Sequence, residues 1–335
     1  MQLIKNKSYG NIIIRLIFLV ALLVISIPEK GFAICNDKSC STSNPGLVGK
    51  PIDLFTGQES FRRTDLTIGN IFPITIERVY SSSSTYDNPI GYGWTSNYDR
   101  RLYVNTDGSV DIQRENGPKK RIAFKNNAYV SPFDDTGTLA TNPDSSFTYT
   151  DKSGSQEVYD STGTLRALVN PNGSSLVFTY IAVTTSPPMP YAGYLLTMIA
   201  EKDATGALTG KKVTFSYNAG GRLAQISDSL GRTVTYVQDS SGNLVTVTAP
   251  LLTSTYGYND PVGNHRMTSI LEGAATYTNT YDSTGRVIRQ THGTGKIDIA
   301  YVIPGQQMSI TTTISDFGGN VLNIQNRVVE FTPKG

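Results

Sequence analysis

The chain has 335 residues, of which 17% are charged, and its formal net charge is +2. So small a charge, with no basic patch, gives no support for a nucleic-acid partner. The 31 glycines and 19 tyrosines, with few stretches rich in strong helix formers, favour strands joined by tight turns, so we expect an all-β protein.

Residues 1–33 predict a Sec-type signal peptide. Three cations precede an apolar run over residues 16–27, and small residues follow at Gly31 and Ala33. The run is too short to cross a bilayer, and the small residues are typical of a signal peptidase site. An uncleaved membrane anchor is the less favoured alternative. We therefore expect a secreted or cell-surface protein that passes through the periplasm in transit.

Removal of this segment changes the charge of the chain. It takes away four of the 29 basic residues and one of the 27 acidic residues, which leaves 25 basic and 26 acidic residues. The net charge of the mature chain is then near −1, so the apparent basicity belongs to the signal peptide.

Residues 34–50 are polar and contain glycine and proline, which predicts an exposed linker. It holds both cysteines, Cys35 and Cys40, and in an exported chain two cysteines five apart favour a small disulfide loop. The two histidines, His265 and His292, lie far away in the sequence, so zinc binding is disfavoured and we expect no metal site.

Residues 51–140 predict a β-rich opening domain. In residues 72–82 Ile74, Ile76, Arg78 and Tyr80 alternate with other side chains, as expected of one face of a strand. Residues 101–124 contain the turn dipeptides Asp107-Gly108 and Asn116-Gly117 between strand-like runs, which predicts a meander of three strands.

Residues 141–335 predict an array of sequence repeats. Residues 158–180, 216–236 and 280–301 share a frame: Tyr, then Asp or Asn, a Gly four positions after the Tyr, and an aliphatic residue two positions after that Gly. A second glycine follows ten positions after the first, at Gly173, Gly231 and Gly295. A period of roughly 20 residues indicates stacked units that bury their apolar faces against one another.

Each repeat predicts a tight turn. An Asp or Asn at the first position accepts hydrogen bonds from the following amides, and a Gly at the fourth adopts the left-handed conformation. The residues expected to open these turns are Asp160, Asn218, Asp239 and Asp282, and those expected to close them are Gly163, Gly221, Gly242 and Gly285.

A catalytic or calcium site has less support. Each repeat offers one carboxylate and Asn218 replaces it in one copy, whereas calcium needs several oxygen ligands on one ion. Asp134-Asp135, or Asp99 with Glu115, could serve as an acid–base pair, but nothing in their surroundings marks them. Neither histidine lies beside a nucleophile motif. We expect no enzymatic activity and no cofactor.

Tyr92, Trp94 and Tyr98 form the best candidate for carbohydrate contact, because aromatic rings can stack on sugars. The favoured alternative is that Gly91 and Gly93 make a tight turn while Trp94 anchors the first sheet on the core.

The repeat motif resembles the YD repeat of the Rhs family. NPGLVGKPIDLFTGQESFRRTDL (44–66), FPITIERVYSSSSTYDNPIGYGWTSNYDRRL (72–102) and DGSVDIQRENG (107–117) resemble the segment that opens Rhs arrays. The resemblance covers residues 44–331. It implies stacked antiparallel hairpins that wind into a partial shell or solenoid behind the opening domain.

In complete family members the shell encloses a C-terminal segment, often a toxin, released at an Asp-Pro-x-Gly-Leu motif. This sequence lacks that motif and ends inside a repeat, so we expect a truncated product or one piece of a split shell. The resemblance implies a non-enzymatic exported scaffold, the N-terminal part of a shell associated with polymorphic toxin delivery. The alternative is a cell-surface YD-repeat module that binds carbohydrate or cells.

The expected partners follow from the same resemblance. They are a further YD-repeat or toxin segment, from the same locus or a separate chain, or a second copy that pairs through an open sheet edge. Glycans are a further candidate, and nucleic acid is not expected.

Overall fold

The computed structural model describes residues 47–115, 117–132, 136–183, 193–293, 295–302, 307–316 and 318–330. The signal peptide predicted for residues 1–33, the disulfide predicted between Cys35 and Cys40, and the pair Asp134-Asp135 lie outside the described residues. Within them all regular structure is β, and no helix is long and apolar enough to cross a membrane. The prediction of an all-β fold is confirmed.

The first part of the chain forms four small antiparallel sheets. Two-stranded sheets pair β1 with β2 and β5 with β6, a three-stranded sheet has the order β3-β4-β7, and a four-stranded sheet has the order β11-β10-β9-β8. The bounds are β1 (Leu47–Val48), β2 (Ile52–Asp53), β3 (Ser60–Ile68), β4 (Ile74–Ser81), β5 (Asp87–Asn88), β6 (Gly91–Tyr92), β7 (Trp94–Ser96), β8 (Arg100–Val104), β9 (Val110–Arg114), β10 (Lys120–Lys125) and β11 (Ala128–Val130).

The rest of the chain forms one sheet of 17 strands in which each strand pairs with its neighbour in sequence. We call this sheet the array. Its strands are β12 (Thr138–Thr141), β13 (Phe147–Thr150), β14 (Gln156–Tyr159), β15 (Leu165–Val169), β16 (Ser175–Ala182), β17 (Tyr194–Lys202), β18 (Leu208–Tyr217), β19 (Leu223–Asp228), β20 (Thr233–Gln238), β21 (Leu244–Thr248), β22 (Thr253–Gly257), β23 (Ser269–Glu272), β24 (Ala275–Tyr281), β25 (Val287–His292), β26 (Gly295–Val302), β27 (Gln307–Asp316) and β28 (Val321–Glu330).

The alternation of side chains in β4 forms as predicted. Ile74, Ile76, Arg78 and Tyr80 are buried, whereas Thr75 and Glu77 between them are half-buried. Because successive side chains of a strand point to opposite faces, one face of β4 lies against the core and the other faces outward. Arg78 is therefore a charged residue on the core face.

The predicted meander also forms, with one strand more than expected. β8, β9 and β10 pair in sequence, and β11 adds a fourth strand. Gly108 closes the first turn with a φ of 79°, and its amide donates to the carbonyl of Asn105 at 3.0 Å.

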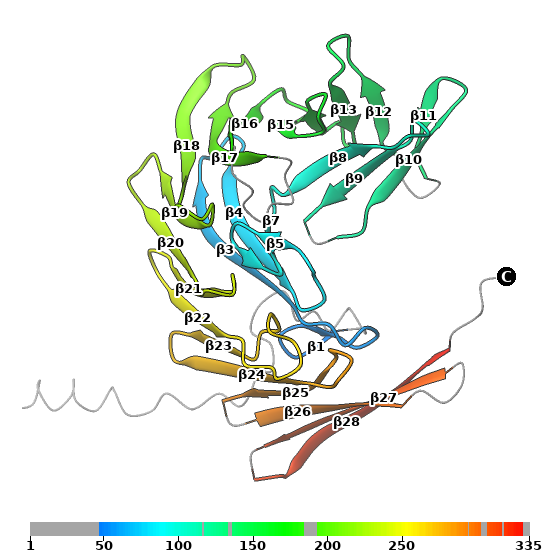
Figure 1. The fold of residues 1–335 in the computed structure, drawn as a ribbon, viewed down its shortest axis with the longest axis vertical. Coiled ribbons are helices and arrows are strands. Elements are labelled where there is room, and N and C mark those ends of the chain that lie inside the picture. The colour runs from blue at the N-terminus through cyan, green and yellow to red at the C-terminus, as the bar shows by residue number, and fades with distance from the viewer. Residues whose placement is uncertain are drawn as a thin grey trace, which may run out of the picture.

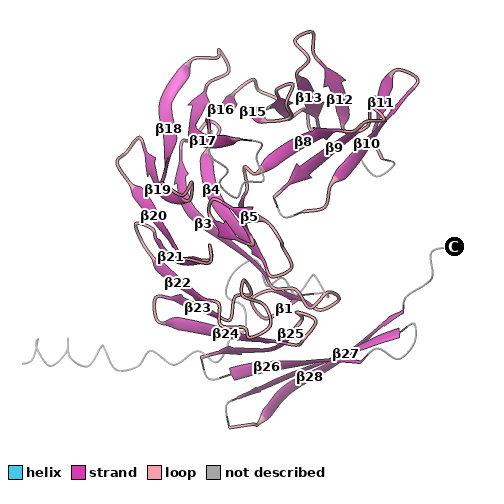
Figure 2. Cartoon of the chain, in the orientation of Figure 1, coloured by secondary structure: helices cyan, strands magenta, loops and turns pink. Residues whose placement is uncertain are grey.

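Figure 1 shows the array curving around the sheet β3-β4-β7, with the sheet β8–β11 at one end of the molecule and β26–β28 at the other. Figure 2 shows that strands and their connecting loops make up the whole described chain. The main core fills the space between the array and the small sheets and contains Phe61, Tyr80 and Trp94. A second cluster joins Ile52 and Leu54 to β25–β27. The hydrophobic effect therefore holds the opening strands against the concave face of the array.

One repeat departs from the predicted spacing. Gly173 and Gly231 have φ values of 88° and 83°, as expected of turn glycines. Gly295 instead begins β26 and pairs with His292, and Gly293 takes the positive φ of 54°. The second glycine of this repeat therefore lies on a strand and not in the turn, because this hairpin has a shorter loop than the other copies.

Candidate functional site: the docked edge of the array

The repeat motif builds a five-residue turn, of which residues 160–164 are the clearest example. The amide of Gly163 donates to the carbonyl of Asp160 at 2.9 Å, and the Asp160 carboxylate accepts from the amides of Thr162 and Thr164 at 2.9 and 3.0 Å. Gly163 has a φ of 79°, a conformation that costs other L-residues free energy. Tyr159 and Leu165 pair across the turn and have no exposed surface, so the motif directs both side chains inward.

The structure places the other six predicted turn residues in the same roles. Glycine amides donate to first-position carbonyls in the pairs Gly221–Asn218 (2.9 Å), Gly242–Asp239 (3.1 Å) and Gly285–Asp282 (3.0 Å). The glycine φ values are 75°, 83° and 89°. The aliphatic residues that follow, Leu223, Leu244 and Val287, are all buried.

Turns of this shape occur at both edges of the array, but only one edge carries the full motif. Hairpins of a meander turn at alternating edges, and the turns 160–164, 218–222, 239–243 and 282–286 all lie on the same one. At the opposite edge the turns 203–207 and 316–320 are followed by Leu208 and Val321, which are 66% and 56% exposed. We call the first edge the docked edge, because the opening strands contact it.

Main-chain hydrogen bonds join the docked edge to the opening strands. The donor–acceptor pairs are Leu102 N to Gly163 O (3.0 Å), Leu223 N to Pro89 O (2.8 Å), Tyr92 N to Gly242 O (2.9 Å) and Val287 N to Gly57 O (2.8 Å). These bonds use backbone atoms, so they depend on the turn shape rather than on side-chain identity. Gly57, near the start of the opening segment, contacts the last of these turns, and Leu102, further along it, contacts the first.

Glycine is required at two of these contacts because the backbones approach closely. A Cβ on Gly163 would lie 1.8 Å from the Leu102 carbonyl oxygen. A Cβ on Gly91 would lie 2.8 Å from the Leu244 amide nitrogen. Both distances are far below van der Waals contact, so a side chain at either place would push the opening strands off the docked edge.

The repeat tyrosines extend the contact into the core. Arg78 and Asp65 form a buried ion pair with an Nε–Oδ2 distance of 2.7 Å. The Tyr236 hydroxyl donates to Asp65 at 2.7 Å, and Arg78 Nη1 donates to the Tyr256 hydroxyl at 2.8 Å. Burial raises the pKa of Tyr236 well above its usual value, so the tyrosine remains a neutral donor. Two tyrosines of the array thus hydrogen-bond to the buried ion pair of β3 and β4 and take the place of water there.

Trp94 lies in the middle of the main core. Its ring has no exposed surface, its Nε1 donates to the Tyr258 hydroxyl at 2.9 Å, and its centroid lies 5.3 Å from that of Tyr80. The Tyr80 hydroxyl donates to the His265 carbonyl at 2.9 Å and accepts from the Met267 amide at 2.8 Å. Both rings anchor β4 and β7 on the array, as in the favoured alternative for Trp94.

The other two residues of the predicted carbohydrate cluster point to different places. Tyr98 is 7% exposed, its hydroxyl accepts from the Thr75 amide at 3.1 Å, and burial raises its pKa to about 12. Tyr92 is half-buried and stacks on His265 with ring centroids 3.6 Å apart. A sugar cannot stack on Trp94 in this arrangement, and the structure does not bring the three rings together on a surface. Carbohydrate binding stays a prediction.

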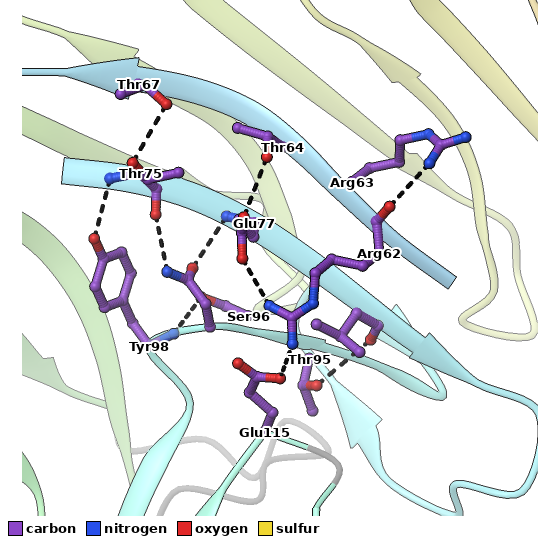
Figure 3. Close-up of polar contacts among 12 residues, drawn as sticks. Arg62, Arg63, Thr64, Thr67, Thr75, Glu77, Thr95, Ser96, Tyr98 and Glu115 are labelled. Carbon is purple, nitrogen blue, oxygen red and sulfur yellow. Dashed lines mark hydrogen bonds and ion pairs between the residues drawn. The ribbon is translucent and has the colours of Figure 1, made fainter. Parts of the chain in front are cut away.

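The outward face of β3 and β4 carries a polar network (Figure 3). Arg62 forms ion pairs with both Glu77 and Glu115, and the Thr64 hydroxyl donates to Glu77 at 3.2 Å. The Asp99 carboxylate instead accepts from the Ser96 amide at 2.8 Å. Asp99 and Glu115 are therefore joined through the main chain, with Glu115 N donating to Asp99 O at 2.7 Å, while different donors hold their carboxylates.

The turn carboxylates are occupied by their own turns. Asp282 accepts from the amides of Thr284 and Arg286 and pairs with the Arg286 guanidinium at 2.8 Å. Burial opposes ionisation of Asp282, but the Thr284 and Arg286 hydrogen bonds outweigh it and lower its pKa to about 2. In the described part of the chain no three His, Cys, Asp or Glu side chains converge as a metal site would need.

A polar cleft of about 510 Å³ lies between β8–β10 and β13–β16. Glu157 in its wall pairs with Arg100 and Arg114 and accepts a hydrogen bond from the Tyr159 hydroxyl at 2.7 Å. Burial would raise the pKa of Glu157, but the two guanidiniums outweigh it and lower the pKa. The ion pairs of Glu157 with Arg100 and Arg114 therefore link the array to the four-stranded sheet at this cleft.

Sequence reasoning missed the charged residues of this interface. Asp65 and Arg78 gave one signal, because Arg78 alternates with apolar residues on the core face of β4. Glu59 gave none, since it lies in a polar stretch, yet it has no exposed surface. Asp65 and Arg78 pair with each other, and the tyrosines that complete their contacts, like the tyrosine that contacts Glu59, come from the array.

The last described strand, β28, pairs with β27 on one side and with no described strand on the other. Val321, Leu322 and Ile324 on this strand are each more than half exposed. Because neighbouring side chains of a strand point to opposite faces, apolar surface is exposed on both faces of the sheet at this edge.

Comparisons with known proteins found matches to parts of this chain. Residues 49–122 match a family model described as a domain of unknown function, DUF6531. The chain is 28% identical over 292 residues to "Double-stranded DNA deaminase toxin A" of Burkholderia cenocepacia (strain H111), a match that covers 75% of this chain and 19% of the relative. The chain thus spans about a fifth of the length of that curated relative.

Two solved toxin structures are also similar. The crystal structure of TcdB2-TccC3 matches with a TM-score of 0.36 and 12% identity, over 73% of this chain and 16% of that chain. The Photorhabdus luminescens Tc holotoxin pore, with a TccC3 mutation, matches with a TM-score of 0.35 and 15% identity, over 85% of this chain and 16% of that chain.

Proposed function

We propose, from the premise that this chain is an Rhs/YD-repeat protein, that it is a toxin-associated scaffold with no enzymatic activity of its own. The observation that carries the proposal is the docked edge. Repeat turns bond the opening strands through backbone atoms, and the repeat tyrosines surround the buried groups of β3 and β4. These residues have an architectural role.

The absence of catalysis is supported by what the candidate groups already contact. Asp99 and Glu115 are held by separate donors, and the turn carboxylates are engaged by the amides that follow them. Catalytic carboxylates need access to a reacting atom. The relative's name specifies a deaminase, but the match covers 19% of that protein, and we do not extend its activity to this chain.

Export is part of the proposal and is supported by the sequence of residues 1–33 alone. A chain that carries a signal peptide would act outside the cytoplasm. Detection of the processed N-terminus at residue 34 in the exported fraction tests this part. An unprocessed chain in the cytoplasm would contradict it.

The partner in this proposal is a further YD-repeat or toxin segment that adds a strand to β28, and a second copy is the alternative. An unpaired strand edge offers a row of main-chain donors and acceptors. Exposed Leu322 and Ile324 add apolar surface that a neighbouring strand would cover. Carbohydrate binding has less support, because Trp94 has no exposed surface.

Light scattering on the purified mature chain, alone and with a YD-repeat segment from the same locus, tests the partner. We expect association at tens of micromolar, a range in which exposed strand edges associate. Leu322→Lys with Ile324→Lys should abolish it, because charges at an edge prevent strand addition. Leu251→Lys is the matched control, since Leu251 is 98% exposed between β21 and β22. A clean monomer with both samples would overturn the proposed edge function.

A further inference from the structure

Glu59 is a buried acid at the contact between the opening segment and the far part of the array. It lies just before β3, and the bridge from Ile52 to Glu59 closes a loop over residues 52–59. We call residues 49–60 the docking arm. The arm bonds β25 through Gly57 and Lys50, whose amide donates to Gln290 at 2.8 Å. Glu59 therefore lies where the arm meets β24 and β25.

The hydrogen bonds around Glu59 fit a protonated carboxyl. The Tyr281 hydroxyl lies 2.8 Å from the Met267 carbonyl oxygen and 3.1 Å from Glu59 Oε2. Tyr281 has one proton, and a carbonyl oxygen can only accept. If Tyr281 donates to Met267, the contact with Glu59 requires that the carboxyl supplies a proton of its own. A neutral acid satisfies both contacts.

The second carboxyl oxygen gives an independent observation. Glu59 has no exposed surface, and its Oε1 has no hydrogen-bond partner. A bare carboxylate needs several donors when it is buried, whereas an unbonded oxygen of a neutral acid costs much less free energy. Burial raises the pKa of Glu59 to about 7, with smaller opposite effects from Asn279, Tyr281 and Lys50.

The charged and titratable groups near Glu59 have other partners. Lys50 pairs with Glu272 at 3.1 Å and lies over the Tyr277 ring. Arg266 and Asp260 pair with each other at 2.9 Å. The remaining titratable neighbours are the hydroxyls of Tyr80, Tyr258 and Tyr281, whose pKa values burial raises. None of these groups supplies the direct cation that would hold Glu59 ionised.

By contrast, Glu201 is a buried carboxyl that has several hydrogen-bond donors. It also has no exposed surface, but it accepts from the amides of Ile71 and Phe72 at 3.2 and 2.7 Å and from the Thr209 hydroxyl at 2.7 Å. The two carboxyls therefore differ in donors rather than in burial.

We propose that Glu59 is a proton-operated latch: the neutral carboxyl holds the docking arm on β24 and β25, and ionisation weakens that contact. The folded arm binds a proton that the released arm loses at lower pH. Between about pH 4.5 and about pH 7 each unit of pH therefore weakens docking about tenfold. Above about pH 7 the loss levels off at roughly 300-fold. The arm is held more tightly in acidic surroundings than in neutral ones.

Hydrogen exchange on the intact mature chain tests this inference. Protection of the docking arm and β24, corrected for the intrinsic exchange rate, is compared at pH 5.5 and pH 8.5 with protection of β8–β10. We expect wild-type arm protection to fall by more than tenfold, and Glu59→Gln to remove this fall because its neutral amide cannot ionise. Glu201→Gln should lower protection near residues 71–72 and leave the pH dependence of the arm unchanged.

Equal pH dependence in wild type and Glu59→Gln would overturn the latch, as would wild-type protection that does not change with pH. Infrared titration of the wild-type chain covers the case in which Glu59→Gln does not fold. A protonated carboxyl band that persists above pH 6 and disappears near pH 7 is expected, and its absence at pH 6 would also overturn the inference.

Discussion

Asp65 and Arg78 form an ion pair that is closed off from water by two tyrosines of the array. The pair spans β3 and β4, and Tyr236 and Tyr256 supply its outer hydrogen bonds from β20 and β22. Tyr236 lies 171 residues after Asp65 in the sequence, and Tyr256 lies 178 residues after Arg78. Two buried charges are tolerated here because each has a full set of partners.

Breaking this pair should destabilise the whole protein. Arg78→Met leaves Asp65 as an uncompensated buried charge, which costs about 3–5 kcal/mol of the free energy of unfolding. The double variant Asp65→Leu/Arg78→Met removes both charges and should lose less than the single one. Urea denaturation measures both, and a double variant no more stable than Arg78→Met would contradict this explanation.

Comparing Gly163→Ala with Gly231→Ala distinguishes the loss of the docked contact from the conformational cost of alanine at a positive φ. Gly163 and Gly231 have φ values of 79° and 83°, so each alanine costs about 1–2 kcal/mol of conformational free energy. The Gly231 Cβ would meet nothing within 4 Å, whereas the Gly163 Cβ would clash with the Leu102 carbonyl. Gly163→Ala should therefore lower the midpoint of thermal unfolding more than Gly231→Ala does. Equal effects of the two substitutions would show that the contact between Gly163 and Leu102 does not stabilise the fold.

The lowered pKa of Glu272 predicts that the folded protein loses stability in acid. Burial opposes its ionisation, but Arg63 and Lys50 outweigh burial and lower its pKa to about 2 from 4.5. A lowered pKa stabilises the fold above pH 4.5, and the contribution disappears as the pH falls from 4.5 through about 2. Stability measured from pH 5 to pH 2 should fall less steeply in Glu272→Gln than in wild type. A slope that Glu272→Gln leaves unchanged would assign the acid sensitivity elsewhere.

Trp94 provides a test of the carbohydrate alternative. Trp94→Ala should cost about 3–5 kcal/mol, because a large buried ring leaves a cavity. Trp94→Phe should retain the fold. Its retention on a glycan array should equal that of the wild-type chain. Tyr92→Ala, at a more exposed ring, is the control. Lost glycan retention by a Trp94→Phe chain of unchanged stability would support the carbohydrate site instead.

The local part of this fold could be predicted from sequence, and the long-range part could not. Asp160 and Gly163 specify their turn within four residues, and the alternation in β4 specifies its core face. The docked contacts could not be predicted, because the Tyr256 hydroxyl meets Arg78 across 178 residues. Glu59 gave no signal, since its burial comes from β24 and not from its own neighbours in the chain.

The two edges of the array show the same limit. Turns at Asp203 and Asp228 have the geometry of the predicted ones, yet they lie on the edge opposite the docked edge. The opening strands meet the Asp228 turn through a side chain, because Arg232 Nη2 donates to the Thr67 carbonyl at 2.7 Å. The turns of the docked edge differ in sequence by the buried pair that flanks them, such as Tyr159 with Leu165. The sequence alone does not say which edge of the array faces the opening strands.

The most direct measurement of the central claim is whether the opening strands stay docked without a covalent connection. A protease site inserted after Pro132, between β11 and β12, would allow the folded mature chain to be cut into two pieces. The docked edge predicts that both pieces elute together under native conditions and separate only in denaturant. Pieces that separate under native conditions would contradict a scaffold built on the docked edge.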